Sequence, residues 1–269
     1  MTTTTSLSAQ TWGNGSPLVL IHGVPGSSGV WSPVAERLAG DFHVIAPDLL
    51  GFGESNGEPG TDDLWADAQA RALTELLDDM DIERAAIVGH DFGGPVALAL
   101  TALRPELATR LVLCATNAFP DTPIPLPIRA VTWPLVGGPA AHLLFSAPSL
   151  RLMTRQAFAG EVPELDDSVW FGDSRQQRTV RTIFSTALRE LPERYAAAER
   201  SVREVNCPSL AIWGAKDPFF PIELGRRTAE ALPDGRFLLY EECGHHPPTE
   251  CPGRFAADVA AFVRDPVTA

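Results

Sequence analysis

The stretch of sequence that decides the fold is Ile87-Val88-Gly89-His90-Asp91-Phe92-Gly93-Gly94. An apolar run typical of a buried strand leads into it, and an Ala- and Leu-rich helical pattern at residues 93–103 follows. The glycines on both sides of Asp91 permit a sharp turn between strand and helix, which leaves the Asp91 side chain exposed on a strained backbone. Aspartate is also a good helix N-cap, so this stretch alone allows either a catalytic or a capping role for Asp91.

Outward from this stretch, short apolar runs alternate with amphipathic patterns along most of the chain. Buried strands are expected at residues 18–21, 42–46, 85–89, 111–115, 209–213 and 237–240, with a further short strand before Trp12. Helices are expected at residues 62–80, 93–103 and 253–264. This alternation predicts the α/β fold class, with a mostly parallel sheet flanked by helices on both faces.

Residues 118–200 interrupt the alternation. Prolines are frequent at the start of this segment, helical patterns follow at residues 143–158 and 176–200, and no run is typical of a buried strand. The chain therefore divides into a core of residues 1–117 and 201–269 and an inserted helical cap of residues 118–200. Open α/β sheets bind ligands outside the carboxyl ends of their strands, where we expect the cap to cover the site. Since the cap is rich in apolar residues, the expected substrate is uncharged and hydrophobic.

The charge balance argues against several classes of partner. The 269 residues include 34 Asp and Glu against 21 Lys and Arg, a formal net charge of −13. Such a chain repels nucleic-acid phosphates and anionic lipid headgroups, so we expect neither a nucleic acid nor a membrane as partner. A small hydrophobic substrate is the expected partner, and the sequence leaves the oligomeric state open, a homodimer included.

Targeting and cysteine patterns point to a reduced, cytoplasmic location. The chain shows no leader sequence and no apolar stretch long enough to cross a bilayer. The four cysteines have no metal-ligand or redox spacing. His90 and His246 are interpreted as packing or hydrogen-bonding neighbours, because the sequence offers no second ligand to complete a metal set. We therefore expect neither a metal nor a cofactor.

Three further motifs follow the ends of other expected strands. The loop HGVPG at residues 22–26 can supply the Val24 backbone N–H to an oxyanion hole, with the N–H of Phe92 as the second donor. An acid, Asp217, follows the strand at 209–213, and His245 follows the strand at 237–240. Each motif alone is compatible with an ordinary turn. Four of them at successive strand ends favour a catalytic site.

These motifs together resemble the α/β-hydrolase superfamily over the whole chain. GHDFGG at residues 89–94 resembles its epoxide hydrolase and haloalkane dehalogenase branch, in which aspartate replaces the usual serine, and HGVP at 22–25 resembles the loop of epoxide hydrolases. DLLGFGES at 48–55 resembles a superfamily segment that we interpret as structural. The terminal pattern G-H-x4-E-x-P selects His245 over His246 as catalytic. The resemblance implies an Asp91 nucleophile, a His245 base and an Asp217 that orients the histidine.

The resemblance also implies a reaction in two steps. Asp91 would attack an sp3 carbon to form an alkyl-enzyme ester, which a water activated by His245 would hydrolyse. Tyr195 is the candidate proton donor for an epoxide oxygen, although epoxide hydrolases usually present two tyrosines. Trp133 in the cap and His22 are further candidates for substrate contact.

Two alternatives remain open at this point. A haloalkane dehalogenase needs side-chain N–H donors for the halide, and neither Phe92 nor Val24 carries one at the corresponding positions. The second alternative is a cofactor-free lyase or cyclase on the same scaffold, in which Asp91 acts as a base or an orienting group.

Overall fold

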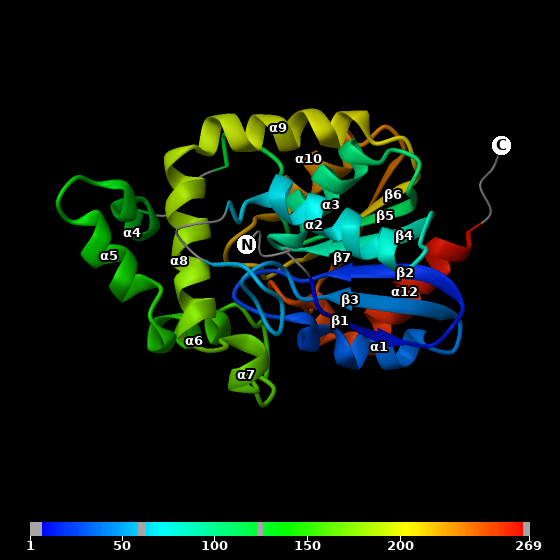
Figure 1. The fold of residues 1–269 in the computed structure, drawn as a ribbon, viewed down its shortest axis with the longest axis horizontal. Helices are drawn as coiled ribbons and strands as arrows, with labels where there is room; N and C mark the ends of the chain where they lie inside the picture. Colours follow the sequence, from blue (N-terminus) through cyan, green and yellow to red (C-terminus); the bar gives the residue numbers. More distant parts are fainter. Residues whose placement is uncertain (1–6, 59–62, 123–125, 266–269) are drawn as a thin grey trace.

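A seven-stranded β-sheet forms the centre of the computed structural model, which describes residues 7–58, 63–122 and 126–265 (Figure 1). Its strands are β1 (Ala9–Trp12), β2 (Ser16–Ile21), β3 (Phe42–Pro47), β4 (Ala85–His90), β5 (Ala108–Cys114), β6 (Ser209–Gly214) and β7 (Gly235–Tyr240). They lie in the order β1-β3-β2-β4-β5-β6-β7. β1 pairs antiparallel with β3 and the remaining neighbours are parallel. The predicted fold class is confirmed.

The sheet is buried on both faces, as its continuous apolar strands require. In β2, Val19 and Ile21 belong to one hydrophobic cluster, and Leu18 and Leu20 belong to another, because successive side chains point to opposite faces. Helices α2 (Ala66–Asp79), α3 (Gly93–Leu103) and α10 (Ile222–Ala231) cover the first face. Helices α1 (Ser32–Leu38) and α12 (Pro252–Arg264) cover the second (Figure 1).

Between β5 and β6, the described residues contain helices and turns but no strand. The elements are α4 (Leu126–Arg129), the 3-10 helix η2 (Ala130–Thr132), α5 (Gly137–Leu144), α6 (Ala147–Gln156), α7 (Asp167–Trp170), α8 (Ser174–Arg189) and α9 (Leu191–Glu204). Figure 1 shows α4 to α8 beside one end of the sheet, while α9 returns along α3. This helical insertion corresponds to the cap predicted at residues 118–200, and its last helix ends at Glu204.

Two of the helices predicted in the cap are each broken in two. The pattern at residues 143–158 divides between α5 and α6, and the pattern at 176–200 divides between α8 and α9. Pro148 and Pro192 lie in the first turns of α6 and α9. Proline has no backbone N–H and is tolerated in the first turn of a helix but not in its interior, so each proline starts a new helix. The helix predicted at 62–80 begins at Ala66, and residue 62 lies outside the described residues.

Helix α8 is fastened to the core by two adjacent side chains. Buried Gln176 donates from Nε2 to the carbonyl oxygen of Pro25 at 2.7 Å, and its Oε1 accepts from the N–H of Gly53 at 3.1 Å. Arg175 donates to the carbonyl oxygens of Gly53 and Ser55 at 2.6 and 2.5 Å. These bonds hold the cap against the loops that follow β2 and β3.

The segment at 48–55 has the structural role predicted for it. The carboxylate of buried Asp48 accepts hydrogen bonds from the backbone N–H groups of Ser28 at 2.7 Å and Glu54 at 2.9 Å. Ser55 donates from its hydroxyl to the Asp48 carbonyl oxygen at 2.6 Å. Asp48 thereby joins the loops after β2 and β3 without reaching the cavity described below.

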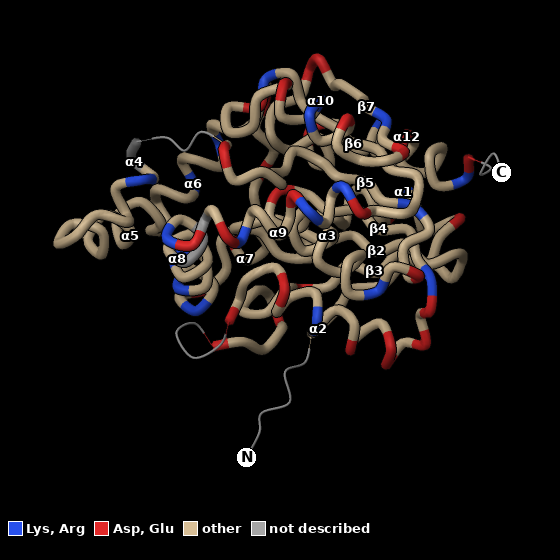
Figure 2. Tube along the Cα trace, turned by 90° about the horizontal axis from the view of Figure 1, so that it is seen from above, with Lys and Arg blue, Asp and Glu red and all other residues tan. Residues whose placement is uncertain are grey.

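Basic and acidic residues are interspersed along the trace of the described chain (Figure 2). Helix α5 is an exception, because it contains no Lys, Arg, Asp or Glu. Among the described residues, no helix combines the length and the hydropathy that a membrane crossing requires.

Candidate active site

Asp91 lies at a sharp turn between β4 and α3. Its φ of +52° is a conformation that residues with a side chain rarely adopt. Close approach of the neighbouring backbone requires glycine at two places: a Cβ on Gly23 would lie 2.5 Å from Asp91 Cβ, and one on Gly93 would lie 2.3 Å from the Ile21 carbonyl oxygen. The N-cap of α3 is Phe92, and the Asp91 side chain does not cap the helix. The capping alternative for Asp91 is therefore wrong.

The structure brings the three predicted catalytic side chains together. Asp91 Oδ2 lies 3.4 Å from His245 Nε2, and His245 Nδ1 lies 2.9 Å from Asp217 Oδ2. Asp217 Oδ1 accepts from the backbone N–H groups of Phe219 and Phe220 at 2.8 and 3.0 Å. The Asp217 side chain is fully buried, whereas that of Asp91 remains 16% exposed. Asp217 can therefore orient the imidazole, while Asp91 is the carboxylate that a substrate can reach.

The surroundings of His245 and Asp91 shift their pKa values so that both side chains are charged. Burial opposes a proton on His245, but Asp217 and Asp91 outweigh it and raise the pKa of His245 to about 10. Burial also opposes the charge on Asp91, yet its contacts with His245, His90 and the Val24 N–H bring its pKa below the usual value. Asp91 is therefore an ionised carboxylate paired with an imidazolium near neutral pH.

Glu250 holds the loop that carries His245. Its carboxylate accepts from the backbone N–H groups of Gly244 at 2.9 Å and of His246 at 3.0 Å. It also accepts from the N–H of Ala159 in the cap at 2.8 Å. This arrangement gives a physical role to the glutamate of the G-H-x4-E pattern, and it ties the histidine loop to the cap.

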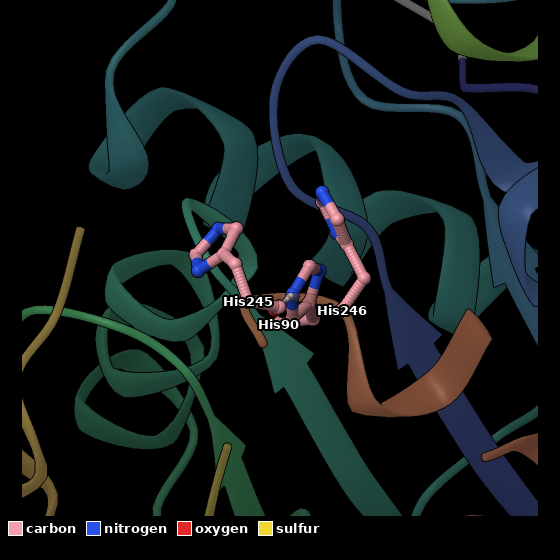
Figure 3. A group of neighbouring side chains, drawn as sticks. All are labelled: His90, His245 and His246. Atoms are coloured by element: carbon pink, nitrogen blue, oxygen red, sulfur yellow. Dashed lines mark hydrogen bonds between the residues drawn. The ribbon is translucent and has the colours of Figure 1, made fainter. Parts of the chain in front are cut away.

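His90, His245 and His246 form a cluster at the end of β4 (Figure 3). Their ring centroids are 4.9 to 5.4 Å apart, and His90 Nε2 is hydrogen-bonded to the His245 carbonyl oxygen at 2.8 Å. Burial and the nearby His245 lower the pKa of His90 to about 4 and that of His246 well below its usual value. The cluster therefore carries a single positive charge, on His245.

Sequence spacing predicted no metal set, but the fold places ligand atoms of these three histidines within 4.8 Å of one another. The expectation that no further ligand lies near His90 and His246 is therefore wrong. Both ring nitrogens of His245 already face carboxylates, so a metal ion bound here would displace Asp91 from its partner.

A cavity of about 190 Å³ lies above the triad, between the strand ends and the cap. Its wall comes from segments that follow β2, β4, β5, β6 and β7 and from several cap helices. The described residues of the wall are mainly apolar, without lysine or arginine, and Asp91 is the acidic residue among them. Prominent apolar members are Val24, Trp65, Leu150, Met153, Ile183, Phe184, Phe219 and Phe220.

Tyr195 from α9 lines this cavity together with Asn117, which follows β5. Burial, reinforced by the charge of Asp91, raises the pKa of Tyr195, and a hydrogen bond with Asn117 acts in the opposite direction. Asn117 Oδ1 already accepts two hydrogen bonds, so the Asn117 amide N–H is the group available to donate to the Tyr195 oxygen. The Tyr195 O–H can then donate to a substrate.

Asn117 lines the cavity but was not predicted as a site residue from the sequence. Its side-chain oxygen accepts from the N–H of Phe119 at 2.9 Å and from the hydroxyl of Thr122 at 2.7 Å, which fixes the orientation of the amide. The available signal was its position within a few residues of the end of a strand, which it shares with Asp91 and His245.

Of the two predicted oxyanion-hole donors, Val24 and Phe92, the structure shows one bonded to Asp91. The Val24 N–H donates to Asp91 Oδ1 at 2.9 Å. Phe92 lines the cavity and its ring lies 5.3 Å from that of Trp65, but its N–H forms no hydrogen bond with Asp91 among the described residues. The Phe92 donor stays a prediction.

Two predicted substrate contacts are placed elsewhere. His22 is fully buried outside the cavity wall, where Nδ1 donates to the Gly23 carbonyl oxygen at 2.8 Å and Nε2 accepts from the Leu49 N–H at 3.0 Å. Burial lowers the pKa of His22, which fits this neutral tautomer. Trp133 is 49% exposed and does not line the cavity. The structure thus gives His22 a loop-holding role and leaves Trp133 at the surface.

Comparison with known proteins supports the geometry of the fold. A 2-hydroxymuconate semialdehyde hydrolase of Pseudomonas sp. (strain CF600) is 30% identical over 269 residues, covering 94% of this chain and 88% of the relative. A solved haloalkane dehalogenase from Bradyrhizobium elkani has a TM-score of 0.79 at 20% identity, with 96% of this chain and 93% of that chain covered. The solved epoxide hydrolase CorEH has a TM-score of 0.75 at 24% identity, with 95% and 93% covered.

At these identities, the two solved structures show a shared fold rather than a shared activity. The sequence profile described as the alpha/beta hydrolase fold matches residues 16–250. That range runs from β2 to Glu250 and includes Asp91, Asp217 and His245. The chain therefore belongs to the α/β-hydrolase fold family.

Proposed function

We propose that this α/β hydrolase uses Asp91 as a nucleophile toward an sp3 carbon and acts as an epoxide hydrolase on uncharged hydrophobic substrates. The observation that carries the proposal is the unequal environment of the two Asp91 oxygens. Oδ1 accepts a hydrogen bond from the Val24 N–H, whereas Oδ2 faces His245 at 3.4 Å. One oxygen is thus held as a future carbonyl oxygen, and the other remains available for attack.

In the first step, Asp91 Oδ2 attacks an epoxide carbon and the ring C–O bond breaks. The epoxide oxygen takes the phenolic proton of Tyr195, and the Asn117 N–H stabilises the phenolate that results. Asp91 becomes a neutral ester. His245 then loses one of the two carboxylates that raise its pKa, so it can return a proton through solvent to Tyr195.

In the second step, neutral His245 takes a proton from water, and the hydroxide attacks Asp91 Cγ. Negative charge develops on Oδ1, where the Val24 N–H donates. The Cγ–Oδ2 bond breaks, and the diol leaves with the proton of the hydroxyl group just added. This restores the Asp91 carboxylate and the His245 imidazolium.

The cavity supports the substrate class. Its described wall is mainly apolar and lacks lysine and arginine, and the imidazolium of His245 is already paired with Asp91 and Asp217, so no free cation is offered to a carboxylate or phosphate of a substrate. The negative charge of Asp91 would further oppose an anionic substrate. An uncharged epoxide with an alkyl or aryl substituent fits these properties.

The test is trapping of the ester in a His245→Gln variant. We expect alkylation of Asp91 to proceed while hydrolysis slows by roughly 10²- to 10⁴-fold, because the general base is lost. The variant is incubated with a panel of uncharged alkyl and aryl epoxides and of 1-bromoalkanes, and its intact mass is measured. An epoxide adds all its atoms, whereas a bromoalkane adds its alkyl group without bromine, so the mass increase identifies the leaving group.

The matched control is the double variant Asp91→Ala/His245→Gln, which should show no adduct. Tyr195→Phe in the His245→Gln background should slow alkylation by epoxides about 10²-fold and leave alkylation by bromoalkanes unchanged. Adducts from bromoalkanes only would identify a dehalogenase instead. An Asp91→Asn variant with full activity, and no adduct from any compound, would exclude the covalent mechanism and favour a lyase or cyclase.

A further inference from the structure

Two cysteines flank the loop that carries His245. Cys243 directly precedes Gly244, and Cys251 follows α11 (Pro247–Glu250). Both are free thiols, and their Sγ atoms lie 2.9 Å apart. The spacing of the cysteines along the chain did not predict this contact. Eight positions separate the two residues along the chain, and the turn through α11 brings them into contact.

The geometry of this pair favours a disulfide over a metal site. Sulfur atoms in a disulfide are about 2.05 Å apart, so closure requires a movement of under about 1 Å. Two thiolates on a tetrahedral zinc ion, each about 2.3 Å from it, would instead lie about 3.8 Å apart. The carboxylate of Glu242, which lies with the two sulfur atoms, is already paired with Arg254 at 2.6 Å.

The two thiols differ in access. Cys251 is half-buried, whereas Cys243 is fully buried, and burial raises the pKa of the Cys243 thiol. An oxidant in solution therefore meets Cys251 first, and Cys243 is positioned to react with the product. Cys114 and Cys207 have no sulfur partner among the described residues.

We propose that Cys243 and Cys251 are a reversible oxidation site that closes a disulfide across the base of the catalytic histidine loop. With a peroxide as oxidant, the Cys251 thiol is oxidised to a sulfenic acid and the peroxide is reduced, releasing one water from hydrogen peroxide. The Cys243 thiol attacks the Cys251 sulfur, the S–S bond forms and a second water leaves. The two thiols lose two hydrogens and two electrons in total, and a dithiol reductant reverses the reaction.

The disulfide closes a ring of residues 243–251, which contains both His245 and Glu250. Glu250 already holds this loop through the backbone N–H groups of Gly244 and His246. Because the sulfur atoms need to move so little, closure leaves His245 near Asp217 and restricts the unfolded chain. Oxidation is thus expected to stabilise the loop in its active geometry, and hydrolytic activity should stay within about twofold of that of the reduced protein.

The test treats the full chain with a small excess of hydrogen peroxide and then blocks free thiols with an alkylating agent. We expect the number of free thiols to fall from four to two. Peptide mapping should link Cys243 to Cys251, and Tm should rise by roughly 5 °C. Dithiothreitol should restore both the thiols and the original Tm.

Cys251→Ser should abolish the peroxide-dependent rise in Tm, and Cys207→Ser should retain it. Peptide mapping of the peroxide-treated wild-type protein shows whether the Cys243–Cys251 disulfide forms even if a variant folds poorly. Four thiols still open to alkylation, or Cys251 oxidised to a sulfinic acid with Cys243 still free, would overturn the proposal. One zinc ion bound per chain, protecting both thiols from peroxide, would overturn it in favour of a metal site. None of these outcomes depends on the reaction proposed for Asp91.

Discussion

Three buried histidines have ring centroids only 4.9 to 5.4 Å apart, yet the pKa of one is raised and the pKa values of the other two are lowered. His245 contacts Asp217 and Asp91, and its pKa is raised to about 10. His90 and His246 are buried without such a pair, and their pKa values are lowered. A carboxylate at hydrogen-bonding distance therefore outweighs desolvation, which would otherwise keep all three imidazoles neutral. The same rule explains how loss of charge on Asp91 would make His245 a base.

At the residue scale, we expect Asn117→Ala to lower the rate of epoxide ring opening by about 10- to 100-fold. Its hydrogen bond stabilises the Tyr195 phenolate, and hydrogen bonds to charged groups contribute roughly 1.5–3 kcal/mol. Single-turnover kinetics with an epoxide measure this rate. If Asn117 acts through Tyr195, the loss should vanish in the Tyr195→Phe background. An equal loss in both backgrounds would show that Asn117 supports the loop and not the phenol.

At the scale of elements, several hydrogen bonds and ion pairs join the cap to the core, and two groups of them hold α8 and the segment after α6. Helix α8 is held by Arg175 and Gln176, and the segment after α6 is held by Glu250. The second attachment continues into the catalytic loop, because the N–H of His245 donates to the carbonyl oxygen of Ala157 at 2.8 Å. Movement of the cap is therefore coupled to the position of His245.

Gln176→Ala should loosen α8, because it leaves the Pro25 carbonyl oxygen and the Gly53 N–H without their partner. The loss of two buried hydrogen bonds is expected to reduce the free energy of unfolding by about 1–3 kcal/mol. Urea unfolding measures this change, and hydrogen exchange should show faster opening of residues 174–189. Gln177→Ala, at a half-buried neighbour whose side chain forms no hydrogen bond among the described residues, is the matched control. Equal effects of the two variants would contradict the anchoring role.

At the scale of the whole molecule, the buried ion pair makes stability depend on pH in two directions. His245 has a pKa raised from 6.5 to about 10, so its contribution is complete below pH 6.5 and is lost as pH rises toward 10. Asp91 has a pKa below 3.8, so its contribution is complete above pH 3.8 and is lost at lower pH. Stability from this site should therefore be greatest between these two limits.

We expect the free energy of unfolding to fall between pH 6.5 and pH 10, by on the order of 3 kcal/mol from His245 alone. Urea titrations at a series of pH values measure this slope. The His245→Gln variant should be less stable near pH 6 and should show a markedly flatter profile over the same range. A parallel profile for the two proteins would mean that His245 is not protonated in the folded state.

The sequence by itself determined the sheet and the positions of the catalytic groups. Short continuous apolar runs that end in turn residues are typical of interior strands, and glycines around Asp91 permit the turn that exposes it. Asp217 and His245 each follow a strand within a few residues, so local spacing placed them at one edge of the sheet. The breaks at Pro148 and Pro192 were also readable from the sequence, because proline is confined to the first turn of a helix.

Only the tertiary structure decided which side chains meet across long sequence separations. It placed Asn117 beside Tyr195, joined Cys243 to Cys251 and gathered His90 with His245, and it left Trp133 at the surface. It also turned His22 away from the cavity to hold a neighbouring loop. Such contacts depend on how the cap and the loops pack together, and composition and periodicity contain no information about that packing. The carboxylate at the turn after β4 was therefore set by local sequence, whereas the groups that surround it were set by the fold.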